Sequence, residues 1–223
     1  MSDLQNIFVA CNTLKDEVML VVEDLKVDAP IIWIDSGLHD FPEKLNKAIQ
    51  EQINRIANVE NIILLFGVCG NSLLGLHSSN ARMIFPKVDD CIALFLGSNE
   101  RKQTLDKKAP SYYFTKGYLE NESNIWSEYN YCIDKYGLKK AKKIYKRMLH
   151  NYKEIKVIDT EAYEPKEIIE RTSNIANEFE LSHKVVEGSL RLIYKAFNEE
   201  WDEDFAIIDA GDQIVYKDLI IKQ

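Results

Sequence analysis

Short apolar runs alternate with segments whose apolar residues recur at helical spacing, near both ends of the chain. This alternation is typical of βαβ units that build a parallel sheet. The expected strands are 7–11, 31–34, 62–66, 82–85, 154–159, 184–187 and 204–208. The expected helices around them are 13–24, 43–57, 165–179 and 190–197. The pattern therefore predicts an α/β fold, Rossmann-like, with a parallel or mixed sheet.

The apolar run 62–66 leads into a turn that contains a cysteine. The run has no polar residue, which is typical of a strand covered on both faces. Gly67 and Gly70 lie on either side of Cys69, and glycine lets backbone approach a ligand because it lacks a Cβ. Ser72 is suited to cap a following helix. A strand, a glycine-cysteine turn and a helix start together indicate a place for chemistry.

The middle of the chain breaks the alternation. Residues 99–108 are polar and are predicted to form a loop, and the aromatic segment 111–118 follows. Helices are expected at about 122–136 and 139–150, the second of which carries a run of lysines. We read this run as a solvated face, with a docking surface for an acidic partner as the alternative.

Two βα runs thus flank a helical insertion. A chain of 223 residues is long enough for one large domain or two small lobes. We predict a single α/β domain over 1–223. One mixed sheet fits the pattern as well as two lobes, 1–98 and 153–223, joined by the helical segment 99–152.

The charge balance excludes some classes of partner. The chain has 36 acidic and 28 basic residues, a net charge of −8, whereas nucleic-acid-binding proteins present a basic face. No apolar run approaches the ~20 residues of a membrane span, and the first residues lack the basic and apolar regions of a signal peptide. We therefore expect a cytoplasmic protein that binds neither nucleic acid nor membrane.

Three cysteines and a histidine are predicted to meet at one edge of the sheet. In open parallel sheets, ligands bind beyond the carboxyl ends of the strands. Cys11 ends the first expected strand and His39 follows the second. Cys69 follows the third strand and Cys91 the fourth. Cys132 falls in the helical middle and is interpreted as a packing residue.

This set of four residues is compatible with more than one chemistry. Three thiolates and an imidazole form a recognised tetrahedral zinc site, and three thiolates can instead hold part of an iron–sulfur cluster. Alternatively, Cys69 is a metal-free nucleophile, activated by the expected helix N-terminus, with His39 as its base. The spacing matches no compact metal motif, and single thiols commonly only pack in a core.

Other polar side chains are expected to flank the same edge. Glu17 lies one turn into the first expected helix and is a candidate catalytic residue. The candidate substrate-binding residues follow or flank the strands and the aromatic segment: Asn71, Arg82, Asp90 and Tyr113.

Several phrases of the sequence resemble a known family. They include residues 9–11, 33–39, 66–73, 86–92, 112–117 and 201–205, with Cys-Gly-Asn at 69–71 and Asp-Cys-Ile at 90–92 as the more specific ones. Together they resemble an uncharacterised single-domain family of anaerobic methyl-metabolising microbes, whose genes often lie beside those for corrinoid proteins and methylamine-type methyltransferases. The family pattern has cysteines and a histidine at the positions of Cys11, Cys69, Cys91 and His39. This chain departs from it at Asn12, where glycine is usual.

The resemblance and the predicted edge together imply a metal-thiolate protein of C1 or corrinoid-linked methyl metabolism. Zinc is the expected metal, iron or an iron–sulfur cluster is the alternative, and a corrinoid is expected only through a partner protein. The implied enzyme is a metal-dependent methyltransferase or a related C1 enzyme with a small-molecule substrate. The second hypothesis is a non-catalytic accessory protein that binds a corrinoid protein or a methyltransferase. The third is a metal-free thiol enzyme that uses Cys69 and His39.

Overall fold

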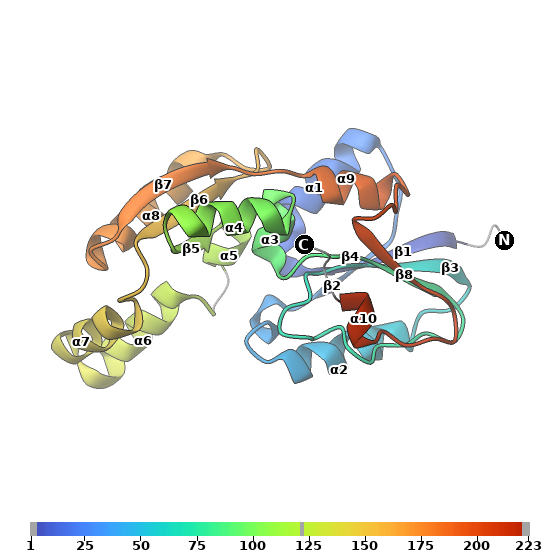
Figure 1. Cartoon of the computed structure of the whole chain (residues 1–223), viewed down its shortest axis with the longest axis horizontal. Coiled ribbons are helices and arrows are strands. Elements are labelled where there is room, and N and C mark those ends of the chain that lie inside the picture. The colour runs from blue at the N-terminus through green and yellow to red at the C-terminus, as the bar shows by residue number, and fades with distance from the viewer. Residues whose placement is uncertain (1–3, 121–122, 220–223) are drawn as a thin grey trace.

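The chain forms two separate sheets (Figure 1). The computed structural model describes residues 4–120 and 123–219. The larger sheet has the strand order β2-β1-β3-β4-β8, in which the first four strands are parallel and β8 is antiparallel to β4. Its strands are β1 (Leu4–Cys11), β2 (Ile31–Ile34), β3 (Val59–Leu65), β4 (Arg82–Pro86) and β8 (Phe205–Ile208).

Helices cover both faces of the larger sheet, which explains why residues 62–65 of its central strand, β3, are all apolar and buried. One face packs against α1 (Lys15–Leu25) and α9 (Arg191–Phe197), where the rings of Phe8 and Phe197 stack at 4.0 Å. The other face packs against α2 (Pro42–Ile53) and α10 (Tyr216–Leu219). The parallel order β2-β1-β3-β4 is that of doubly wound α/β folds. The predicted α/β, Rossmann-like class is therefore confirmed.

The smaller sheet contains three parallel strands in the order β5-β6-β7. They are β5 (Ser111–Phe114), β6 (Glu154–Asp159) and β7 (Ser182–Glu187). The helices that share a core with this sheet are α5 (Lys116–Glu120), α6 (Ile125–Tyr136), α7 (Leu138–Met148) and α8 (Pro165–Glu178). Figure 1 shows the α6–α7 hairpin projecting away from the larger sheet. We call each sheet with its helices a lobe, the larger lobe and the smaller lobe.

The chain passes between the lobes in a way that the apolar pattern does not reveal. The smaller lobe takes β5 from the segment 99–152, and the larger lobe takes β8 from the segment 153–223. Lobe boundaries at 98 and 153 therefore do not coincide with the two sheets. Periodicity identifies a strand, but it does not say which strand lies beside it. The residues Tyr113 and Ile158 of the smaller sheet also belong to the core of the larger lobe.

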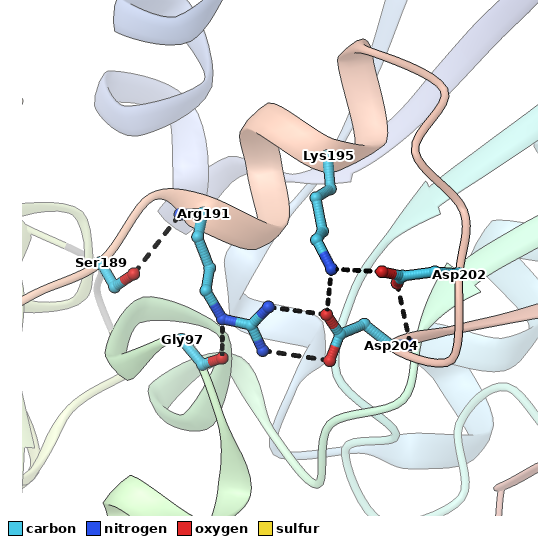
Figure 2. Close-up of polar contacts among 6 residues, drawn as sticks. All are labelled: Gly97, Ser189, Arg191, Lys195, Asp202 and Asp204. Atoms are coloured by element: carbon cyan, nitrogen blue, oxygen red, sulfur yellow. Dashed lines mark hydrogen bonds and ion pairs between the residues drawn. The ribbon is translucent and has the colours of Figure 1, made fainter.

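Two stretches of chain connect the lobes, and they are bonded to each other (Figure 2). The first contains α3 (Cys91–Leu96) and α4 (Asn99–Lys108), and the second runs from β7 through α9 to β8. Arg191 Nε donates a hydrogen bond of 2.8 Å to the Gly97 carbonyl, and the Arg191 guanidinium forms two bonds with Asp204. These bonds from Arg191, followed by those from Lys195, lower the pKa of Asp204 to about 2. The pairing holds the two connections side by side.

Two local predictions differ from the structure. Residues 99–108 form α4 and no loop, because Ser98 accepts a hydrogen bond from Arg101 N and caps the helix. No helix follows Ser72; residues 70–75 form turns, and the Ser72 hydroxyl donates to the Val68 carbonyl at 3.2 Å. The apolar pattern of residues 88–97 does not distinguish a strand from a helix, and the structure has α3 there. The expected helix start at residue 122 lies outside the described residues. Across the described ranges, no helix is long and apolar enough to cross a membrane.

Candidate functional site

A cavity of about 600 Å³ lies where the two lobes meet. The larger lobe contributes the thiol side of its lining, with Cys11, His39, Cys69 and Cys91. The smaller lobe contributes an aromatic side, with Tyr112, Tyr113, Tyr118 and Tyr152. The structure thus brings together the four residues that were expected at one edge of the sheet.

Close backbone packing places two of the thiols in this cavity. Cys69 lies in the turn after β3, where its N–H donates to the Asp89 carbonyl at 2.9 Å. A Cβ on Gly67 would overlap the backbone of Asp90, so only glycine lets this turn approach the start of α3. The Asp90 carboxylate caps α3 by accepting from Ala93 N, which fixes Cys91 as the first residue of that helix. Cys11 enters the same cavity as the last residue of β1.

The three thiols are protonated at neutral pH. Burial, with a smaller contribution from the neighbouring Cys11, raises the pKa of Cys69 to about 12. Burial also raises the pKa of Cys91 well above its usual range, with added contributions from Cys69 and Cys11. The pKa of Cys11 is raised by burial, although Thr13 Oγ1 donates to its sulfur at 3.1 Å and opposes the shift. Burial therefore disfavours all three thiolates, and the neighbouring thiols further disfavour those of Cys69 and Cys91.

This environment corrects the expectation that Cys69 is activated by a helix N-terminus. No helix follows Cys69, and burial dominates its pKa. The apolar surroundings favour the neutral thiol, which is a poor nucleophile. In the described residues, no hydrogen bond joins Cys69 to His39.

His39 presents one ring nitrogen that has no hydrogen bond. Its Nδ1 makes a short contact with the Ser36 carbonyl, which assigns the proton to Nδ1. Nε2 is buried, lies 3.2 Å from Asp40 Oδ1, and forms no hydrogen bond within the described chain. The ring lies beside Tyr118, with centroids 5.5 Å apart. A histidine held by Nδ1–H to a carbonyl keeps the Nε2 lone pair available to a ligand or a proton.

The aromatic side of the cavity has few free polar groups. Tyr113 donates its hydroxyl proton to Asp106 at 2.8 Å, and Tyr112 donates to Tyr118 at 3.3 Å. Burial raises the pKa of Tyr113 and of Tyr118, so both rings are neutral. This side therefore offers mainly ring surface to a small molecule.

Asp90 and Lys102 form an ion pair on the cavity wall. Lys102 and Asp106 were not predicted as site residues, because residues 99–108 were expected to be a loop. The sequence Ser98-Asn99-Glu100, a capping residue followed by an acidic residue in the first turn, is the signal that indicates α4. Tyr118 and Tyr152 were missed because nothing in the pattern places them beside the thiols.

Three of the predicted site residues do not line the cavity. Arg82 begins β4, whose other end is nearer the site, and its Nε donates to Asn61 Oδ1 at 2.9 Å. Asn71 is exposed, with a φ of +69°. Glu17 is buried in α1, away from the cavity lining, and accepts a hydrogen bond of 2.9 Å from Thr160 Oγ1. Asp90 and Tyr113 do line the cavity. Within the described residues, no group of three or more His, Cys, Asp or Glu side chains is arranged to hold a metal ion.

Comparison with known proteins gives one distant structural likeness and one family. The ligand-free, open structure of CD0873, a substrate binding protein with adhesive properties from Clostridium difficile, is similar over 88% of this chain and 84% of that chain. The sequence identity is 10% and the TM-score is 0.32. We draw no conclusion about this chain from so distant a likeness. No curated protein matches the sequence. A match to the family described as "Protein of unknown function (DUF1638)" covers residues 33–197, well over half of the chain, and the chain therefore belongs to that family.

Proposed function

We propose that the cavity is a metal-thiolate site in which Cys11, Cys69 and Cys91 bind zinc. The observation that carries the proposal is that three thiols from three separate elements share one cavity, close enough for Cys11 to raise the pKa of both Cys69 and Cys91. Core packing gives no reason to gather thiols at the carboxyl ends of parallel strands, where ligands bind. A bound divalent cation deprotonates thiols whose pKa is otherwise high, so burial alone does not prevent ligation.

The residues present have the donor chemistry that such a metal needs. Three sulfurs and an imidazole form a known tetrahedral zinc set, and the buried His39 Nε2 has no hydrogen bond in the described chain. As they stand the side chains are not in ligating positions, so binding requires rotation of cysteine side chains between staggered χ1 wells. Zn²⁺ with three thiolates would have a net charge of −1. Lys102 lies on the cavity wall and stabilises negative charge at Cys91.

The proposed role is methyl or thiol chemistry in C1 or corrinoid-linked metabolism. When bound, zinc would keep sulfur deprotonated and nucleophilic at neutral pH. The cavity leaves room for a small molecule beside the thiols, and the rings of Tyr112 and Tyr118 would hold its apolar part and exclude water. His39 Nε2 would either complete the ligand set or accept a proton from a substrate thiol. The link to corrinoid proteins rests on the sequence phrases 69–71 and 90–92.

Titration with cobalt(II) under anaerobic conditions tests this proposal. Cobalt substitutes for zinc and gives an intense visible spectrum in a tetrahedral thiolate site. We expect such a spectrum at one equivalent, its loss in Cys69→Ser and Cys91→Ser, and its retention in the matched control Cys132→Ser, whose thiol is in the smaller-lobe core. A spectrum that survives Cys69→Ser, or that never forms, would contradict the site.

The α6–α7 hairpin favours a second candidate function, that of an accessory protein with an acidic partner. Residues 125–148 contain seven Lys or Arg residues against Glu128 and Asp134, a net charge of +5 within a chain of net charge −8. Lys139, Lys143 and Arg147 follow one another at four-residue spacing on α7, are exposed, and form no ion pair with any described residue. The exposed Tyr131 beside this charge adds apolar contact area.

Co-purification with a corrinoid protein distinguishes the accessory role from the metal site. Reversing Lys139, Lys143 and Arg147 to Glu should abolish the association if the hairpin carries it. Cys69→Ser should leave the association unchanged. Association that is lost in Cys69→Ser and kept in the reversed hairpin would assign the interaction to the cavity.

A further inference from the structure

The lobes also touch at a second place, beside the cavity and apart from the two connections. Here the 3-10 helix Asn12–Leu14 and α1 of the larger lobe meet α5 of the smaller lobe. A Cβ on Gly117 would overlap the Thr13 carbonyl, so the two backbones are in direct contact. Lys116 Nζ pairs with Asp16 Oδ2 at 3.0 Å across the same contact. Thr13 and Tyr118 line the cavity, and parting the lobes here would widen its mouth.

Glu17 lies inside this contact and is incompletely satisfied. Its side chain is 0% exposed, and its Oε1 accepts from Thr160 of the smaller lobe. Its Oε2 has no hydrogen-bond partner among the described residues. A fully buried carboxyl group with one bare oxygen is rare, since a buried charge normally has a partner.

The charged and titratable groups around Glu17 do not supply that partner. Asp16 precedes it on α1, and Lys116 of α5 is already paired with Asp16. Glu120 lies near Lys116 on α5, while Tyr163, with Asp159 near it, faces Glu17 from the smaller lobe. Burial raises the pKa of Glu17 to about 7, and it is only partly opposed by the backbone N–H of Glu17 itself, by the hydrogen bond from Thr160 and by Lys116. At mildly acidic pH the proton resides on the carboxyl group, which removes the uncompensated charge.

We propose that Glu17 is a proton-sensitive contact that regulates access to the thiol cavity, closed when Glu17 is protonated and loosened when it is ionised. The regulation acts on the cavity of the proposed function but does not require that the cavity bind a metal. Once the contact parts, water reaches the carboxylate, whose pKa returns to its ordinary 4.5. The open form is therefore favoured progressively as pH rises from about 4.5 to about 7, and no further above that range.

Thiol accessibility in metal-free protein tests the proposal. The probe is 4,4′-dithiodipyridine, added to protein treated with a chelator, with the labelled cysteines identified by peptide mapping. The matched variant is Glu17→Gln, which keeps the acceptor for Thr160 and cannot ionise. The ratio of wild-type to variant rates cancels the intrinsic effect of pH on thiols. We expect this ratio for Cys11, Cys69 and Cys91 to rise about tenfold or more between pH 5 and pH 7 and then level off.

A second variant separates this role from a merely structural one. Thr160→Val removes the hydrogen bond that lowers the pKa of Glu17, so the rise in the ratio should extend to higher pH than in the wild type. A ratio that stays flat from pH 5 to pH 8, or a Thr160→Val profile identical to the wild type, would overturn the proposal. Because the protein is metal-free in this experiment, either result leaves the cobalt test of the proposed function intact.

Discussion

Glu17 is a buried carboxyl group whose ionisation opposes folding. Its pKa is about 7 in the folded chain against an ordinary value of 4.5, because burial disfavours the charged form. The folded state thus binds the proton more tightly than the unfolded state. The resulting stability is fully present below about pH 4.5 and is lost as pH rises to about 7.

Replacing Glu17 with Gln should therefore remove a pH dependence of stability. Between pH 5 and pH 8, the wild-type free energy of unfolding should fall relative to that of the Gln variant by on the order of 3 kcal/mol. Urea unfolding at the two pH values measures the difference. Glu23→Gln, an exposed change on the same helix, is the control and should follow the wild type. Wild-type and Glu17→Gln curves that run parallel with pH would contradict this account.

Some single residues could be placed from the sequence and others could not. Cys11, His39, Cys69 and Cys91 follow strand ends, and parallel strands bring their carboxyl ends to one edge whatever the rest of the fold. Arg82 was expected at the same edge but does not reach the cavity, because it lies at the start of β4 and not at its end. The tyrosines of the smaller lobe reach the cavity through the packing of two sheets, which no local pattern encodes.

Among the structural elements, the turn after β3 controls the distance between two thiols. Gly67 lies against the backbone of Asp90, directly before Cys91, and a methyl group there would force the turn and α3 apart. The closeness of Cys69 and Cys91 therefore depends on a missing side chain. The distance between the two thiols is therefore a property of the turn, and a substitution at Gly67 changes it while both cysteines remain present.

The change Gly67→Ala should weaken metal binding without removing a ligand. We expect a loss of about tenfold or more in cobalt affinity, together with about 1–3 kcal/mol of stability, the usual cost of overpacking. The control is Gly37→Ala, whose Cβ would approach only the Asp35 carboxylate, at 3.2 Å. Affinity in Gly67→Ala equal to that of the control would mean that the turn does not position the thiols.

The regular elements of the fold were largely predictable because their periodicity is strong. The strands around 62–66 and 154–159 and the helix near 43–57 have unbroken patterns. By contrast, α4 contains one apolar position, Leu105, and is stabilised by its cap at Ser98. The helix expected after Ser72 is absent because Asn71 and Gly75, on either side of it, have positive φ angles of 69° and 80°, which an α-helix does not allow.

In the whole molecule, the two connections and the Glu17 contact hold the lobes on either side of the cavity. The connections depend on Arg191, which bonds both Gly97 and Asp204 (Figure 2). Nothing in the apolar pattern indicates that segments so far apart in sequence are bonded together. The arrangement of two lobes around a thiol cavity follows from these long-range contacts.

Removing the Arg191 contacts should loosen the lobes at every pH. For Arg191→Met we expect a loss of stability of about 1 kcal/mol, since the pair is partly exposed, and a several-fold faster reaction of the cavity thiols with 4,4′-dithiodipyridine. The pH profile should keep its wild-type shape, because Glu17 is unchanged. Lys217→Met, at an exposed lysine of α10, is the control. A changed pH profile in Arg191→Met would mean that the two contacts are not independent.

Elemental analysis of protein purified without oxygen, together with its visible spectrum, gives the sharpest test of the claim that three thiols form a metal site. We expect about one zinc per chain, no colour, and loss of the zinc in Cys69→Ser but not in Cys132→Ser. A brown protein containing iron would keep the ligands and change the metal to a cluster. Protein without metal, or zinc that remains in Cys69→Ser, would contradict the claim.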